Sequence, residues 1–543
     1  MFLAYLRKKV VVTLLAFFGL VLVFQLLTTF LDTSPLTNVK VPSYLSSSLP
    51  SLSGHYINSI TQAEASDHDF PLASHDFWPQ FYTALIAATP RCALPHKHIE
   101  AWITGFQQGN DVPSQDLIQL APEDEAELKA AHAWFVDAIS STSFPKLPFT
   151  AGTSGVVTSA GGEFLPEALV SIRMLRRTGS TLPVDVFLAT PEEDEGELCT
   201  TVFPALNATC RILSTMLSDV QGGLPHRHNI TRYQLKAFAL MLSDFDNVLW
   251  VDADQIPLVD PRTILEAEPL KSQGMVVWPD YWYQTTSPLF YRVAGVDEVP
   301  HTGERAASET GQFMLAKSKH WKTLLLATYY NFHGPSHYYK LLSQGAVGEG
   351  DKETFAAAAV ALDEQFYAVK TGIDTIGFND ASGNRKDTGM LQAHPGYDYA
   401  KHGGGKGSGW EIESKSKVPP AFLHDEQHKP NAGRFSKLWR ERIKQRMWQP
   451  ADNMLQRFGF DIEEAVWSEI VWTACGQALG GHVFKDWIDN NEVDQSSSVC
   501  SQAQDVYETM FGKAWKDNDG AVNVLDVVAS DGFGGGGPAD AHD

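Results

Sequence analysis

The sequence predicts an α/β fold, in which strands and helices alternate and the ligand site lies where strands end. Residues 155–160 have the composition of a strand, residues from about 165 to 177 have helical spacing, and residues 182–189 read as a second strand. A strand, a helix and a strand in this order form a βαβ unit. The unit predicts a parallel sheet that binds its ligand at the carboxyl ends of the strands.

The alternation of strands and helices continues after this unit, and a helical segment precedes it. Apolar residues recur at helical spacing between residues 77 and 139. The further elements predicted for the sheet region are a helix at 233–242, strands at 247–251, 275–278, 313–316 and 421–424, a helix from about 319 to 332, and an Ala-rich helix that begins at 348–355.

The N-terminal segment predicts a membrane anchor. The run Val10 to Leu31 carries no charge over 22 residues, and as a helix it would span about 33 Å, which is enough to cross a bilayer. Three basic residues precede the run and Asp32 follows it, so the positive-inside bias places the remaining chain across the membrane from the cytosol. A cleaved signal peptide is the alternative, but the run is long for one and no clear A-x-A site follows it.

The composition changes along the chain predict seven segments. A Ser, Thr and Pro-rich stretch after the anchor is typical of a stem, and the glycine-rich end of the chain is typical of a disordered tail. The predicted segments are a cytosolic tail (1–9), a transmembrane signal anchor (10–31), a stem (32–75), a helical preface (76–150), a catalytic domain (151–437), a helical C-terminal appendix (438–531) and a disordered tail (532–543).

The composition of the 543 residues is that of a globular protein. The formal net charge of -23 argues against a nucleic-acid partner and against an acidic membrane surface. Five cysteines occur without metal-finger spacing, and in a lumen some of them would form disulfides. Cys199 with Cys210 and Cys475 with Cys500 are the pairs closest in sequence, which leaves Cys92 over, but the spacing alone leaves the pairing open.

Two carboxylates at the end of the predicted strand 247–251 are the first candidate site. Asp252 and Asp254 stand one residue apart, so they can converge on one divalent cation whose open positions face a cleft. Such a cation can hold a diphosphate. The alternative for an isolated DxD is an ordinary strand-to-turn exit, with Pro257 and Pro261 in the loop.

Several motifs around this DxD together resemble one enzyme family. They include 167–184, 235–239 with Lys236, the DxD run itself, WPDYW at 278–282, Glu309 to Gln312, and GEGDKETF at 348–355. In this order, over roughly residues 153–430, they resemble the fungal Golgi α-1,2-mannosyltransferases that branch cell-wall mannan, of the fungal α-mannosyltransferase superfamily. WPDYW and GEGDKETF are the most distinctive of these motifs.

The resemblance implies a Golgi single-pass type II membrane enzyme with a luminal catalytic domain. The implied fold is a GT-A-like (Rossmann-like) nucleotide-sugar transferase fold carried on a transmembrane helix and stem. The implied reaction transfers mannose from GDP-mannose to α-1,6-mannan or related mannose acceptors on cell-wall glycoproteins, in α-1,2 linkage, with retention and with Mn²⁺. A Golgi mannosyltransferase complex is a further implied partner. The alternatives are an α-1,3-mannosyltransferase of the chain-capping type and a non-catalytic subunit.

The residues predicted to hold the metal and the donor follow from the DxD and the resemblance together. Asp252, Asp254 and His424 are the predicted metal ligands, and His428 is the rival of His424. Lys236 and Lys352 are predicted to contact the donor, although a solvated lysine is an equal alternative for Lys352. A phosphatase of the haloacid-dehalogenase type is disfavoured, because at least two strands precede the DxD and Ile256 stands where that class needs Thr or Val.

Two carboxylates are predicted to act at the donor sugar. Asp351 follows two glycines that let the backbone approach a ligand, but it also fits a helix N-cap before Thr354. Glu309 is expected ahead of a strand. A retaining enzyme needs a carboxylate nucleophile or a front-face path in which the leaving phosphate takes the acceptor proton, and both stay open. The predicted acceptor contacts are Trp278, Asp280, Tyr281 and Gln312, although aromatic residues after a strand also suit a core.

Overall fold

The computed structural model describes residues 72–217, 230–403, 417–425, 429–434, 446–448, 457–489 and 498–517. The chain divides into two units, Met1–Asp69 and Phe70–Asp543, and the described residues belong to the second. The predicted anchor, the 532–543 tail, nearly all of the stem and His428 lie outside the described residues. Among the described helices, none is long and apolar enough to cross a membrane.

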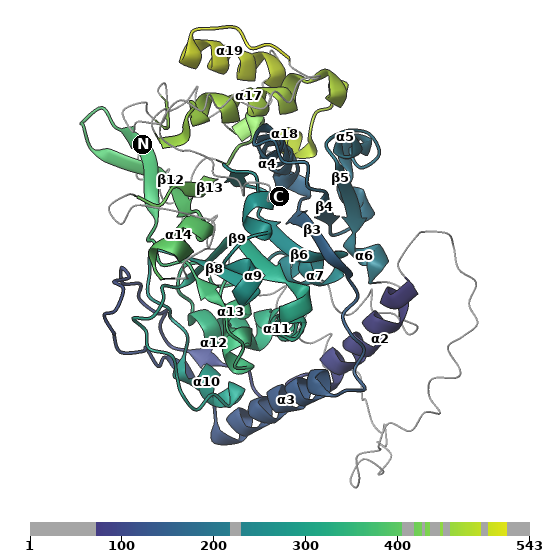
Figure 1. Ribbon diagram of the computed structural model, residues 1–543, viewed down its shortest axis with the longest axis vertical. Coiled ribbons are helices and arrows are strands. Elements are labelled where there is room, and N and C mark those ends of the chain that lie inside the picture. The colour runs from purple at the N-terminus through teal and green to yellow at the C-terminus, as the bar shows by residue number, and fades with distance from the viewer. Residues whose placement is uncertain are drawn as a thin grey trace, which may run out of the picture. The chain divides into compact units, whose positions relative to one another are not determined.

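A seven-stranded mixed sheet lies at the centre of this unit (Figure 1). Its strand order is β10-β8-β9-β6-β3-β4-β5. The strands are β3 (Thr150–Ser159), β4 (Val184–Leu188), β5 (Ala208–Ile212), β6 (Phe245–Val251), β8 (Met275–Pro279), β9 (Ser308–Ala316) and β10 (Tyr367–Ala368). The pairing of β3 with β4 is parallel and the helix α4 (Leu165–Arg177) connects them, which confirms the predicted βαβ unit.

The expectation of a parallel sheet is wrong at β9. This strand runs antiparallel to both β6 and β8. A parallel neighbour requires a crossover that returns the chain to the end of the sheet from which it started. The segment between β8 and β9 contains only the short helix α10 (Pro288–Ala294) and makes no such return. The sheet is therefore mixed.

A second sheet of four antiparallel strands begins directly after the DxD. Its order is β11-β12-β13-β7, with β11 (Asp374–Asn379), β12 (Arg385–Ala393), β13 (Pro420–Asp425) and β7 (Gln255–Pro257). The strand β13 was predicted, whereas β7 was expected to be part of a loop. Asp252 to Asp254 is thus the junction at which the chain leaves the large sheet and enters the small one.

The large sheet separates two hydrophobic cores. Along β6, Leu249 packs into a core with α4 and the small sheet, whereas Val248 and Trp250 pack into a core with the helices of the opposite face. Because successive strand residues point to opposite faces, a strand covered on both sides is apolar throughout. The helices of the second core include α2 (Leu72–Ala87), α3 (Pro122–Ser140), α7 (Gln234–Leu242), α11 (Lys317–Phe332) and α13 (Thr354–Ala361).

The helices α2 and α3 confirm the helical spacing predicted at the two ends of the segment 77–139, whereas residues 88–121 contain no helix and include two short strands. The remaining short elements are β1 (His96–Lys97), β2 (Ile118–Gln119), α5 (Val202–Ala205), α6 (Leu213–Met216), α8 (Arg262–Leu265), α9 (Leu270–Gln273), α12 (Tyr339–Ser343) and α14 (Pro395–Lys401).

The C-terminal helices are α17 (Ile462–Cys475), α18 (Lys485–Asp489) and α19 (Val499–Phe511), and α17 packs against α4 (Figure 1). The buried carboxylate of Glu469 on α17 accepts hydrogen bonds from Arg173 and Arg177 of α4. The Arg173 guanidinium also lies 3.9 Å from the centroid of the Trp472 ring. These contacts use the arginines of α4 to attach the C-terminal helices to the sheet domain.

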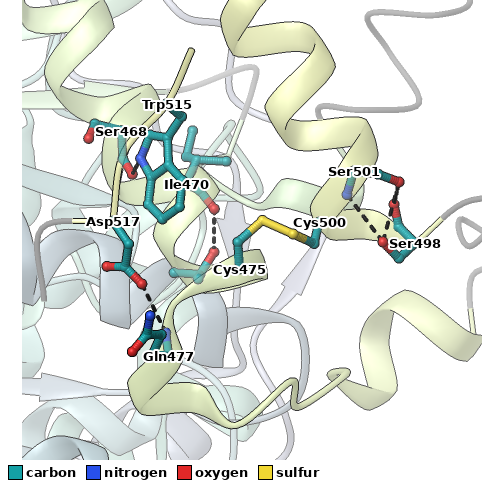
Figure 2. The surroundings of a disulfide bond; sticks show 10 residues. Ser468, Ile470, Cys475, Gln477, Ser498, Cys500, Ser501, Trp515 and Asp517 are labelled. Atoms are coloured by element: carbon teal, nitrogen blue, oxygen red, sulfur yellow. Dashed lines mark hydrogen bonds between the residues drawn. A yellow bond between two sulfur atoms is a disulfide. The ribbon is translucent and has the colours of Figure 1, made fainter.

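Two disulfides are present, and both join the cysteines closest in sequence. Cys199 pairs with Cys210 and Cys475 with Cys500, whereas Cys92 is free. The second bridge joins the end of α17 to the start of α19 (Figure 2). Trp515, beyond α19, donates a hydrogen bond of 3.1 Å from Nε1 to the carbonyl of Ser468. The last described residues are thereby fastened to α17.

Replacing Glu469 should weaken the fold strongly. Glu469→Ala leaves Arg173 and Arg177 without their carboxylate, and removing one partner of a buried ion pair typically costs about 3 kcal/mol or more. We expect a reduction of this size in the free energy of unfolding, measured by urea denaturation of the purified protein. Glu508→Ala on the exposed side of α19 is the matched control and should change stability little. Equal midpoints for the two variants would contradict this role of Glu469.

Acid should destabilise the protein through His132. The His132 ring on α3 is buried beside Tyr330, with 2.7 Å between Nε2 and the hydroxyl, and burial lowers its pKa to about 4. Between about pH 6.5, where a histidine of the unfolded chain titrates, and pH 4, the unfolded state binds the extra proton. Stability is therefore lost as the pH falls through this window, by up to about 3 kcal/mol.

The variant His132→Gln should flatten this pH dependence. The measurement is the urea midpoint at several pH values between 4 and 7. His301→Gln is the control, because the His301 side chain is 74% exposed. A His132→Gln profile as steep as that of the unaltered protein would show that another group causes the acid sensitivity.

Candidate active site

The site forms at the edge of the large sheet where β6 ends. Val251, the last residue of β6, pairs with Gln312 of β9. The amide of Asp252 then donates to the carbonyl of Gly311, at 2.8 Å. The two strands run antiparallel, so the end of β6 meets the beginning of β9. This arrangement brings Glu309 and Thr310 beside the DxD.

Lys236 connects the first DxD carboxylate to Asp351. Its Nζ lies 3.3 Å from Asp252 Oδ1 and 3.0 Å from Asp351 Oδ2, and it donates to the carbonyl of Thr310 at 2.7 Å. Burial alone would lower the pKa of Lys236, but the two carboxylates raise it above its ordinary value. Trp250 fixes Asp252 from the other side by donating from Nε1 to Oδ1 at 2.6 Å. Lys236 is therefore a buried ammonium between two carboxylates.

Asp254 faces a different set of residues. His424 Nε2 lies 3.5 Å from Asp254 Oδ2, and the ammonium of Lys429 forms an ion pair with the same oxygen. Burial alone would raise the pKa of Asp254, but His424 and Lys429 hold it well below its usual range. Burial opposes the positive charge of His424, but Asp254 and Glu309 raise its pKa to about 9. Each carboxylate of the DxD thus has its own lysine.

The small sheet positions His424. In the antiparallel pairing of β13 with β7, His424 lies opposite Gln255, the residue after Asp254. The prediction that His424 lies beside the DxD agrees with this register. On the other side of the ring, Nδ1 lies 3.7 Å from Glu309 Oε1, which is too long for a hydrogen bond.

Glu309 and Gln312 lie within β9, not ahead of a strand as predicted. Glu309 Oε1 accepts from the amide of Gly311 at 2.6 Å, and burial raises its pKa. Gln312 is fully buried and accepts a hydrogen bond from Gln255. Glu309 therefore faces the site, whereas Gln312 joins the two sheets and its position does not support acceptor binding.

Asp351 is not a side-chain helix cap. The helix α13 begins at Thr354, and the cap position is Glu353. The Thr354 hydroxyl donates to the backbone carbonyl of Asp351 at 2.6 Å. The carboxylate of Asp351 takes no part in this bond and faces Lys236. The side chain of Glu353 turns the other way and accepts from Arg305 at 2.8 Å.

The predicted acceptor residues separate into two groups. Trp278 is 1% exposed, packs against Phe422 and donates from Nε1 to the carbonyl of Ala393 at 2.8 Å, so its ring belongs to the core. Asp280 and Tyr281 instead line an open pocket of about 220 Å³. Phe106, Arg305 and Lys370 line the same pocket. Lys352 donates to Asp280 at 3.0 Å, beside this pocket.

The donor atoms of the site fit a divalent cation. Two carboxylates and an imidazole are ligands of the kind that Mn²⁺ accepts, and buried His424 Nδ1 has no hydrogen-bond partner among the described residues. Within the same residues, no three His, Cys, Asp or Glu side chains are already arranged around a common point. Asp252, Asp254 and His424 are the residues that would hold the cation, and their side chains would have to move to share it.

Lys429 is a site residue that sequence reasoning missed. It is the fourth residue after the end of β13, and its spacing from His424 has no meaning until the small sheet is known. Arg305, which precedes β9 and lines the pocket with Asp280, was also missed. The sequence held a signal for Arg305, which lies four residues before Glu309, but none for Lys429, which is 175 residues from Asp254.

Comparisons with known proteins identify the family of this chain. A family described as "Mannosyltransferase putative" matches residues 153–306 and 296–397. An α-1,2-mannosyltransferase of Saccharomyces cerevisiae, MNN2, is 31% identical over 67% of this chain and 69% of its own length. MNN21 of Candida albicans, also an α-1,2-mannosyltransferase, is 32% identical over 68% of this chain and 64% of its own length, so the chain spans less than two thirds of that relative.

Solved structures resemble the chain more distantly. The glycosyltransferase GlyE of Streptococcus pneumoniae is 14% identical over 64% of this chain and 66% of its own, with a TM-score of 0.31. The galactosyltransferase LgtC is 10% identical over 56% of this chain and 95% of its own, with a TM-score of 0.30. Both TM-scores are too low to support a conclusion about function.

The sequence relatives and the acidic site at the strand ends define a glycosyltransferase. Within that class, the chain belongs to the mannosyltransferase family that includes the fungal MNN2-type α-1,2-mannosyltransferases.

The ion pairs of Lys236 should be essential to the folded site. Lys236→Met leaves the carboxylates of Asp252 and Asp351 close together without the ammonium between them. We expect the free energy of unfolding to fall by about 3 kcal/mol, because an uncompensated buried charge remains. Adding Asp351→Asn should restore part of the loss, since the amide carries no charge. Urea denaturation of the three proteins tests this, and a double variant less stable than Lys236→Met would contradict it.

Proposed function

We propose that the protein is a retaining, metal-dependent α-1,2-mannosyltransferase that transfers mannose from GDP-mannose to α-1,6-mannan or a related mannose acceptor on cell-wall glycoproteins. The observation that carries the proposal is the gathering of Asp252, Asp254, Asp351 and Glu309 with two lysines at one sheet edge, in a chain of this family. The mixed α/β sheet with the DxD at a strand end supports a GT-A-like fold.

The diphosphate of the donor would bind at the DxD. When bound, Mn²⁺ there supplies Lewis-acid stabilisation of the leaving diphosphate. Asp252, Asp254 and His424 would hold the cation. Lys429 adds a cationic group beside Asp254, and Lys236 pairs with Asp252 and Asp351 and orients both. These contacts would set the donor with its sugar toward Asp351 and Glu309.

The two remaining carboxylates would act at the mannose. Asp351 is held by Lys236 at a fixed place and suits a contact with the donor sugar. Glu309 lies between His424 and the amide of Gly311, on the side where the anomeric carbon would face. Retention requires either one of these carboxylates as nucleophile or a front-face path in which the leaving phosphate takes the acceptor proton.

The acceptor would bind in the pocket lined by Asp280 and Tyr281. Carboxylate and guanidinium groups bond to sugar hydroxyls, and the rings of Phe106 and Tyr281 offer apolar faces to a sugar ring. Lys352 lies next to Asp351 in sequence and bonds to Asp280. It therefore connects the donor side of the site to the acceptor pocket. The net charge of -23 suits a neutral glycan acceptor rather than a nucleic acid.

We further propose that the enzyme is a single-pass type II protein of the Golgi membrane. The uncharged run at residues 10–31 with basic residues before it supports this topology. The two disulfides suit an oxidising lumen. A Golgi mannosyltransferase complex is the proposed assembly.

The test is transfer by the purified protein from GDP-mannose to α-1,6-mannobiose with Mn²⁺. Asp252→Ala and Asp254→Ala should each lower kcat/KM by at least about 100-fold, corresponding to about 2.7 kcal/mol of transition-state stabilisation. Asp260→Ala is the matched control, because Asp260 lies after the small strand β7 and pairs with Arg262. Wild-type activity in both DxD variants would overturn the metal assignment.

Analysis of the product separates the alternatives. An α-1,2 linkage supports the proposal, and an α-1,3 linkage assigns the chain to the capping type. An intact folded protein that neither transfers mannose nor hydrolyses GDP-mannose would point to a non-catalytic subunit.

A further inference from the structure

Lys429 occupies a position that a cation at the DxD would need. Its ammonium forms an ion pair with Asp254 Oδ2, which is also the oxygen that faces His424 Nε2. An ammonium and a divalent cation cannot both lie against one carboxylate oxygen without strong repulsion. Lys429 must therefore leave Asp254 Oδ2 when a cation binds there. Since Lys429 is partly buried, its charge then needs another partner.

Glu167 is a carboxyl group without a partner close to this position. It is fully buried in the first turn of α4, and neither of its oxygens has a hydrogen-bond partner among the described residues. One turn further along the helix, Ser171 donates to the carbonyl of Gln255, the residue after Asp254, at 2.6 Å. Residues four apart lie on the same helix face. Glu167 therefore lies on the face of α4 that is turned toward Gln255 and the DxD.

The electrostatic surroundings of Glu167 agree with this placement. Burial raises the pKa of Glu167 well above its usual value; Asp254 raises it further and Lys429 lowers it. Asp425 and Asp486 act on it more weakly. Of these acids, Asp486 already accepts a hydrogen bond from Asn431, at 3.2 Å. An unpaired buried carboxyl is unfavourable, so its presence close to a partly exposed lysine indicates a second state in which it is paired.

We propose that Lys429 has two carboxylate partners, Asp254 when the DxD holds no cation and Glu167 when it does. This inference rests on the metal-dependent function proposed above. In the first state Lys429 neutralises Asp254. In the second state the ammonium moves to Glu167, which prevents it from opposing the bound cation. Glu167 and Lys429 are thus positioning residues that set the affinity of the DxD for its cation.

The test is Mn²⁺ binding to the purified protein without donor, measured by the electron paramagnetic resonance signal of free Mn²⁺. Lys429→Met should tighten Mn²⁺ binding by about tenfold, because the competing ammonium is gone. Glu167→Gln, which keeps the shape of the side chain, should weaken binding by a similar factor. In the Lys429→Met background, Glu167→Gln should have almost no effect, since no ammonium needs the carboxylate.

Lys513→Met is the charge-matched control, because Lys513 pairs with Glu464 among the C-terminal helices, and it should leave Mn²⁺ affinity unchanged. Should Lys429→Met fail to fold, Lys429→Gln makes the same test. Unchanged or weaker Mn²⁺ binding on loss of Lys429 overturns this inference and leaves the proposed function standing. The inference is also overturned if Glu167→Gln weakens Mn²⁺ binding equally in the wild-type and Lys429→Met proteins. That result would reflect only the lost charge of Glu167. A wild-type protein that binds no Mn²⁺ overturns the metal-dependent function as well.

Discussion

Buried negative charge at the end of β6 is the constraint on which the site depends. Asp252, Asp254, Asp351 and Glu309 lie at one edge of an otherwise apolar sheet, where unpaired carboxylates would be strongly unfavourable. The chain meets this requirement with cationic side chains from three separate elements: Lys236 from α7, His424 from β13 and Lys429 after it. The folded site is therefore already charge-compensated before any ligand arrives.

That compensation has a consequence for ligand binding. A donor diphosphate brings negative charge, and a divalent cation brings positive charge, into a region where both DxD carboxylates are already paired with a lysine. Binding must then exchange partners rather than add new ones. Lys236 is buried between two carboxylates and suits a fixed role, whereas the side chain of Lys429 is 26% exposed and suits the exchange. Two lysines in similar chemical surroundings thus differ in their freedom to move.

Local patterns in the sequence predicted much of the fold and part of the site. The βαβ unit, the strand before the DxD and the strand before His424 were readable because their apolar runs end at turn residues. The antiparallel direction of β9 was not readable from the sequence, since the direction of a strand depends on the path by which the chain returns to the sheet. Glu309 was placed ahead of its strand because β9 begins before its apolar run does. Lys429 was missed because its position depends on the pairing of the small sheet. Trp278 was assigned to the acceptor because composition does not distinguish a buried ring from an exposed one.

The junction between the two sheets links the positions of Asp252, Asp254 and His424. Asp252 belongs to the end of the large sheet, but Asp254 is followed at once by β7, the edge strand of the small sheet. His424 is carried by the next strand of that same small sheet. A tilt of the small sheet would therefore carry Asp254 and His424 together relative to Asp252. The separation of the two DxD carboxylates therefore depends on how the small sheet is oriented relative to the large one.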